Sequence, residues 1–200
     1  CAVMWEIAAQ TPEEKARVAR FHERIVQHIL RNDYNLVHVD GKPTLWGRWH
    51  PDYVNGFPPS IGDRRLNSAE IIAILQFSYR AAGNDLFREK AFDLLNRSGY
   101  LDNIRGSMKL IHATPGHIYE GNDMGNEWNH SDDLLAFVTY WVLHRFAFND
   151  QLKAHYVGAI RDHWEIERPE RSPLWNFVYA STGTTNADLS EALWTLRRFP

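Results

Sequence analysis

Ser131-Asp-Asp-Leu-Leu-Ala-Phe-Val-Thr-Tyr140 repeats the polarity pattern of Ser68-Ala-Glu-Ile-Ile-Ala-Ile-Leu-Gln-Phe77 at every position but the second. Each stretch opens on a serine, a residue that caps helix N-termini, and continues as a largely apolar helix. Asn149-Asp150 matches Asn84-Asp85 at the start of the helix that follows each stretch. The spacings are 131 − 68 = 63 and 149 − 84 = 65 residues. A repeat of nearly fixed period predicts stacked helical hairpins, each with a buried inner and a more polar outer helix.

Other elements surround these hairpins. A helix is predicted from Thr11 to Leu30, because Thr11 suits the N-cap and Pro12 the first helical position. A third unit is expected to begin at Asn186, and residues 2–9 resemble the tail of a helix. Residues 35–49 alternate around an Asp-Gly turn and predict a short β-hairpin or extended loop. Glycines and prolines predict long loops over residues 50–65 and 99–129. Pro169 and Pro173 are expected to stop a helix and stiffen the loop that follows it.

A helical hairpin cannot bury its apolar face alone, so the units must stack as an open solenoid or a closed ring. Long aromatic loops would converge at one end of a ring, which favours the ring. The predicted fold is all-α, with α/α-hairpin repeats forming a partial α/α toroid. Residues 1–200 are interpreted as one domain cut from a longer chain. An incomplete ring would expose an apolar flank, so self-association or contact with a missing segment is expected there.

The composition narrows the class of ligand. A net charge of −3 without a Lys/Arg cluster argues against nucleic acid, and no apolar run is long enough to span a membrane. The single cysteine, Cys1, excludes an intramolecular disulfide. The 8 Trp and 8 Tyr provide ring faces that suit sugars, although aromatic residues also fill helix interfaces. We predict a carbohydrate partner and no cofactor; the compartment stays open, with an extracellular or periplasmic one favoured.

Three groups of residues are candidates for the site. The first lies at the start of the second inner helix: Ser131 and Asp132 suit capping, whereas Trp128, Asn129, His130 and Asp133 point to function. Asp63, Arg64 and Arg65 hold the equivalent place before the first inner helix. In the second group, ion pairing within the loop and ligand contact are equally open roles for Arg168 and Arg171, and Trp175 follows them. The third group has the aromatic interleaving of a glycan cleft and consists of His38, Asp40, Trp46, Arg48, Trp49, His50 and Tyr53. Tyr34 is a further candidate for substrate binding.

Several motifs also carry a resemblance to a known family. The stretch from Tyr34 to Gly47, Leu66-Asn-Ser-Ala-Glu70, Asn129-His-Ser-Asp-Asp133 and Glu167-Arg-Pro-Glu-Arg-Ser-Pro-Leu-Trp-Asn176 resemble a family of largely uncharacterised bacterial proteins. Its members look like six-hairpin glycosidase-type α/α toroids, and the resemblance covers nearly the whole chain. The wider toroid superfamily includes glycoside hydrolases and polysaccharide lyases, so the resemblance implies sugar chemistry by analogy of fold.

These residues allow several functions. In a glycoside hydrolase, Asp133 at the positive helix end would be the ionised base and Glu167 the acid. In a lyase acting on uronic acids, Asn129 and Arg168 would neutralise the substrate carboxylate while His130 or Tyr34 removes the proton. A non-catalytic glycan-binding or protein-binding scaffold is the alternative. A metal site of His130, Asp132 and Asp133 lacks a supporting His-x-x-x-His spacing, so no metal is predicted.

Overall fold

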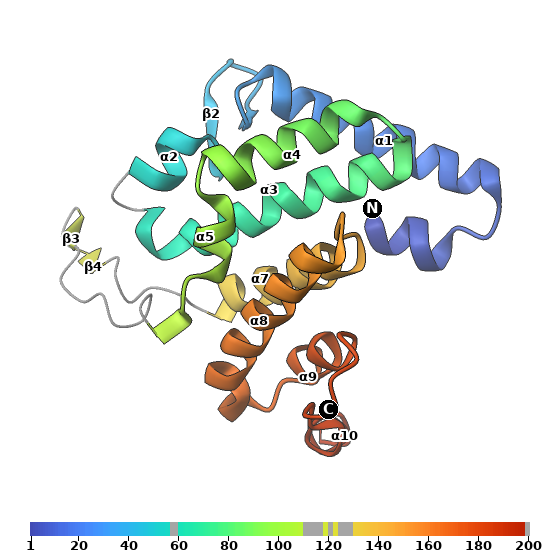
Figure 1. Ribbon diagram of the computed structural model, residues 1–200, viewed down its shortest axis with the longest axis vertical. Helices are drawn as coiled ribbons and strands as arrows, with labels where there is room; N and C mark the ends of the chain where they lie inside the picture. Colours follow the sequence, from blue (N-terminus) through green and yellow to red (C-terminus); the bar gives the residue numbers. More distant parts are fainter. Residues whose placement is uncertain (57–59, 110–117, 120–121, 124–129, 199–200) are drawn as a thin grey trace.

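The computed structural model describes residues 1–56, 60–109, 118–119, 122–123 and 130–198, and it is predominantly helical (Figure 1). The helices are η1 (Met4–Ala8), α1 (Pro12–Arg31), α2 (Pro51–Gly56), α3 (Ser60–Ala82), α4 (Asp85–Arg97), α5 (Tyr100–Arg105), α7 (His130–Arg145), α8 (Asp150–Glu167), η2 (Arg168–Glu170), α9 (Pro173–Ala180) and α10 (Leu189–Leu196). The antiparallel strand pairs are β1 (Asn35–Val37) with β2 (Pro43–Arg48), and β3 (Ile118–Tyr119) with β4 (Asn122–Asp123).

Both predicted hairpins are present, as α3 with α4 and α7 with α8. The outer helices are capped as expected, because the side chain of Asn84 accepts a hydrogen bond from the Leu86 amide and that of Asn149 accepts one from the Leu152 amide. The starts of the inner helices differ from the prediction. Helix α3 begins two turns earlier, at Ser60, so Ser68 lies buried inside it and its hydroxyl accepts a hydrogen bond from Asn103 instead of capping the helix.

The two inner helices lie side by side at the centre of the molecule (Figure 1). Helix α3 contacts α1, α2, α4, α5 and α7, and the second hairpin continues through contacts of α8 with α9 and of α9 with α10. The two inner helices run in the same direction, since Asp132 acts electrostatically on Asp63 near their N-terminal ends and Gln76 donates to the Leu143 carbonyl in their C-terminal halves. This parallel arrangement brings the N-terminal turns of both inner helices to one end of the molecule. Within the described part of the chain, no helix has the length and apolarity that a membrane crossing requires.

The N-terminal segment packs against the opposite end of the inner helices. Residues 2–8 are helical, in agreement with the predicted helix tail over residues 2–9, and Met4–Ala8 form the π-helix η1. Its Trp5 ring meets the rings of Phe77 and Phe146, and Glu6 pairs with Arg145 at the end of α7. Helix α1 then begins as predicted, with reciprocal capping between Thr11 and Glu14.

The structure departs most from the sequence-based predictions in the segments that were predicted to be loops. Residues 50–65 hold α2 and the first turn and a half of α3, and residues 99–129 hold α5. Pro173 starts a helix, because the first helical position tolerates a residue without an amide hydrogen. The third unit begins at Leu189, capped by Asp188, and the β1–β2 hairpin forms around Gly41 as expected.

His22 of α1 should make the fold sensitive to acid. Its ring lies 4.7 Å from the Phe77 ring, and burial lowers its pKa to about 4. Because the unfolded histidine keeps a pKa near 6.5, the unfolded state binds the proton first as the pH falls. The free energy of unfolding is unaffected by protonation of His22 above pH 6.5. Between pH 6.5 and about 4, protonation of this histidine in the unfolded state lowers the free energy of unfolding by about 3 kcal/mol in total. Urea unfolding between pH 7 and 4 should therefore show a shallower loss of stability in His22→Leu than in the wild type; parallel curves would contradict this.

Candidate active site at the N-terminal ends of α3 and α7

A buried chain of hydrogen bonds connects α3, α7 and α8. Arg65 Nε donates to the Tyr140 hydroxyl at 3.1 Å, this hydroxyl lies 3.0 Å from His163 Nδ1, and His163 Nε2 lies 3.0 Å from Asp133 Oδ1. Since the Tyr140 oxygen accepts from arginine, its own hydrogen is directed to Nδ1. A neutral His163 then carries its proton on Nε2 and donates it to Asp133. The chain therefore fixes the position of the Asp133 carboxylate.

Arg65 anchors this chain from the other side. Its guanidinium donates to Asp162 Oδ2 at 2.8 Å, to the Gly106 carbonyl at 2.7 Å and to the Ala159 carbonyl. Although burial opposes it, hydrogen bonds from the Met108 amide and Arg65 hold the pKa of Asp162 below its usual value. The side chain of Arg65 is thus paired inside the protein and does not face a ligand.

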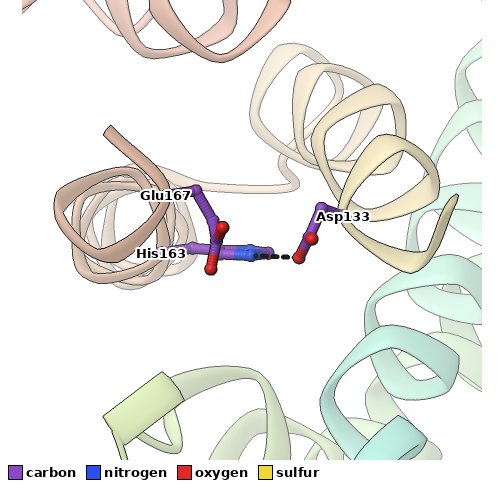
Figure 2. Close-up of side chains that lie close together, drawn as sticks. All are labelled: Asp133, His163 and Glu167. Atoms are coloured by element: carbon purple, nitrogen blue, oxygen red, sulfur yellow. Dashed lines mark hydrogen bonds and ion pairs between the residues drawn. The ribbon is translucent and has the colours of Figure 1, made fainter. Parts of the chain in front are cut away.

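Asp133, His163 and Glu167 gather between α7 and α8 (Figure 2). One nitrogen or oxygen atom from each side chain lies within 4.8 Å of the other two. The structure therefore brings together Asp133 and Glu167, the carboxylates predicted as a hydrolytic pair. However, Asp133 is only 4% exposed. Its carboxylate is oriented toward His163 and is closed to a polymer, while the combination of imidazole and carboxylates is one that binds metal ions.

A second group of carboxylates lies at the same end, on the facing sides of α3 and α7. Burial, followed by the negative charges of Asp132 and Glu70, raises the pKa of Asp63 to about 6. Asp63 and Glu70 are two turns apart on α3, and so lie on the same side of it. Burial also raises the pKa of Glu70, against the effect of a 2.9 Å hydrogen bond from Trp49 Nε1. Asp63 is consequently a carboxyl group that keeps its proton in mildly acidic solution.

Glu70 also lines an open cavity of about 250 Å³ between α1, α3 and α7. Ala73 and Ile74 of α3 and Val138 of α7 form much of its wall. From the sequence, Asp63 is distinguished only by its place before the inner helix, and Glu70 is not among the predicted site residues. The available signal was the carboxylate pair seven residues apart in an otherwise apolar helix, a spacing that puts both on one face.

Two of the predicted sugar-binding tryptophans are buried. Trp175 is 1% exposed, stacks on Phe137 with ring centroids 4.4 Å apart, and donates Nε1 to Glu170. Trp49 is buried as well and donates to Glu70. Trp175 fills a helix interface, so the prediction that it contacts substrate needs correction, whereas Trp49 lines the cavity of about 250 Å³ beside Glu70. Trp46 on β2 differs, since it is 76% exposed.

The predicted arginines act mainly within the protein. Arg168 pairs with Asp188 at 3.1 Å, and Arg171 approaches Glu191 at 3.8 Å, so both connect the end of α8 to α10. The two arginines are therefore ion-paired, but with acidic residues at α10 and not within their own loop as the ion-pairing alternative had it. The Arg48 guanidinium lies 4.1 Å from the Tyr53 ring.

The two predicted proton acceptors are placed differently. His130 is exposed at the start of α7, with its Nδ1 3.2 Å from Glu170. Burial raises the pKa of Tyr34 to about 12, so its hydroxyl stays protonated near neutral pH and is a poor base. Trp128 and Asn129 lie outside the described residues.

Comparison of the chain with models of protein families, with curated proteins and with solved structures finds no match.

Proposed function

We propose that the chain is part of an α/α toroid and hydrolyses a carbohydrate polymer, with Asp63 as the general acid and Asp132 as the ionised carboxylate. The observation that carries this proposal is the meeting of carboxylates from two adjacent inner helices at their N-terminal ends. Glycoside hydrolysis requires such a pair, one carboxyl protonated and the other ionised. Asp63 retains its proton to about pH 6, and the positive end of α7 favours negative charge on Asp132.

The proposed catalytic acid and base differ from the predicted pair, Asp133 and Glu167, for a physical reason. A catalytic carboxyl must reach the glycosidic bond, and the closed environment of Asp133 prevents this. Asp63, Glu70 and Asp132 are each half-buried, so all three keep some access to solvent, and burial raises the pKa of Asp63 and of Glu70. Trp46 is an exposed ring that suits contact with a sugar face, and it stays part of the proposal.

The toroid is supported by the parallel inner helices and by the surface that they leave open. Phe21 of α1 and Leu135 and Val138 of α7 are large apolar side chains that are exposed to solvent. Further hairpins packed beside α1 and α7 would cover them, as would self-association. A non-catalytic scaffold that binds a protein is the second candidate function, and the same exposed apolar residues favour it.

The test is the release of reducing ends and of unsaturated uronates across a polysaccharide panel. The variants are Asp132→Asn and, as a control, Asp150→Asn, which changes an exposed aspartate in the first turn of α8. We expect reducing ends from the wild type and the control and none from Asp132→Asn. Unsaturated products would indicate a lyase instead. If the wild type releases no product from any polysaccharide of the panel but still binds a glycan or protein, hydrolysis is contradicted and a non-catalytic scaffold is supported.

A further inference from the structure

We propose that Asp133, His163 and Glu167 form a binding site for one zinc-like divalent metal ion between α7 and α8. This site is separate from the carboxylates assigned to hydrolysis, so the inference goes beyond the proposed function. One imidazole and two carboxylates are ligands that zinc accepts, with water completing the coordination.

The backbone places the three ligands together. His163 and Glu167 are four residues apart on α8, so they are neighbours on one side of that helix, and Asp133 faces them from the first turn of α7 (Figure 2). His163 Nε2 and Asp133 Oδ1 are 3.0 Å apart, and all three ligand atoms lie within 4.8 Å of one another. Two ligands bound to the same zinc ion at about 2.0 Å are separated by roughly 3 Å. Small side-chain movements therefore suffice for coordination.

Burial of the ligands also favours a cation. Asp133 and His163 are buried and Glu167 is half-buried. Carboxylates held close together in a medium of low dielectric repel each other, and a divalent ion offsets that repulsion. The cationic Arg65 stands behind the histidine and is engaged with Asp162.

The outer partner of His163 is of the kind found at metal sites. Its Nδ1 lies 3.0 Å from the Tyr140 hydroxyl, which Arg65 holds in place. A hydrogen bond to the second ring nitrogen orients a ligating histidine and fixes its tautomer. When the ion binds Nε2, the proton on this atom is lost to solvent and one proton from solvent is taken up at Nδ1. The new Nδ1–H donates a hydrogen bond to the Tyr140 oxygen, whose own hydrogen rotates away from the ring. The ring stays neutral, and binding switches its tautomer.

Calorimetric titration of the metal-stripped protein with zinc chloride tests the site without any sugar substrate. The informative variant is Glu167→Gln, and its matched control is Glu165→Gln, a 62% exposed position on the same helix. We expect one zinc ion per chain in the wild type and the control, and at least a tenfold weaker affinity in Glu167→Gln. Circular dichroism checks that each variant is folded.

The tautomer provides a second readout that a surface metal site would not give. Zinc should move the ¹⁵N shifts of His163 from the Nε2–H to the Nδ1–H pattern. The proposal is overturned if the wild type takes up no zinc, if Glu167→Gln binds as tightly as the control, or if the His163 shifts do not respond. Because none of these measurements depends on hydrolysis, failure of this site is distinguishable from failure of the proposed function.

Discussion

Replacing Asp63 with asparagine is expected to lower kcat for glycoside hydrolysis by about 10² to 10⁴, the usual contribution of a positioned general acid. Asparagine keeps the shape of the side chain but has no proton to give to the leaving oxygen. In the wild type the acid must be protonated, so activity should fall as the pH rises through about 6, the raised pKa of Asp63. This basic limb should disappear from any residual activity of the variant. Initial rates from pH 4 to 8 measure both effects.

The stability of the same variant separates a chemical from a structural effect. The pKa of Asp63 in the folded state is above its ordinary value of 3.8. The contribution of Asp63 to the free energy of unfolding is therefore most favourable below pH 3.8 and is lost as the pH rises through about 6. At neutral pH the wild type holds an ionised, half-buried carboxylate. Asp63→Asn should therefore be more stable at pH 7, by up to about 3 kcal/mol. An inactive variant that is also less stable would weaken the assignment, and Asp102→Asn, at an exposed position on α5, should change neither property.

Arg65→Met should destabilise the protein by about 3 to 5 kcal/mol, the usual effect of removing one partner from a buried ion pair. Methionine preserves much of the volume but leaves Asp162, the Tyr140 hydroxyl and two carbonyl groups without their donor. The chain that orients His163 would lose its anchor. Urea unfolding at pH 7 measures the effect.

The neighbouring arginine is the natural control. Arg64 is half-buried and donates to the carbonyl groups of Val54 and Asn55, whereas Arg65 is only 1% exposed. Arg64→Met should lower the free energy of unfolding by about 1 kcal/mol for these hydrogen bonds. Equal losses in the two variants would mean that the buried network contributes little.

The helical hairpins could be predicted because their signals are local. Asn84 and Asn149 cap the outer helices within three residues of their own positions, and the apolar runs of α3 and α7 have no polar face. The predicted loops failed where tertiary contacts decide. Helix α2 holds Pro51 and Gly56, and the first turn of α3 holds Gly62; packing against the core compensates for their poor intrinsic propensity.

The candidate site, too, could be predicted only in part from local sequence. Local sequence placed Asp132 and Asp133 in the first turn of an inner helix, and it placed Asp63 just before the other, at the point taken as equivalent to Asn129 and His130. Tertiary structure decided which of these carboxylates is closed off by His163 and which keeps a proton beside Glu70. The reason is that burial and charge repulsion depend on the distance between helices far apart in the chain, and local periodicity contains no information about that distance.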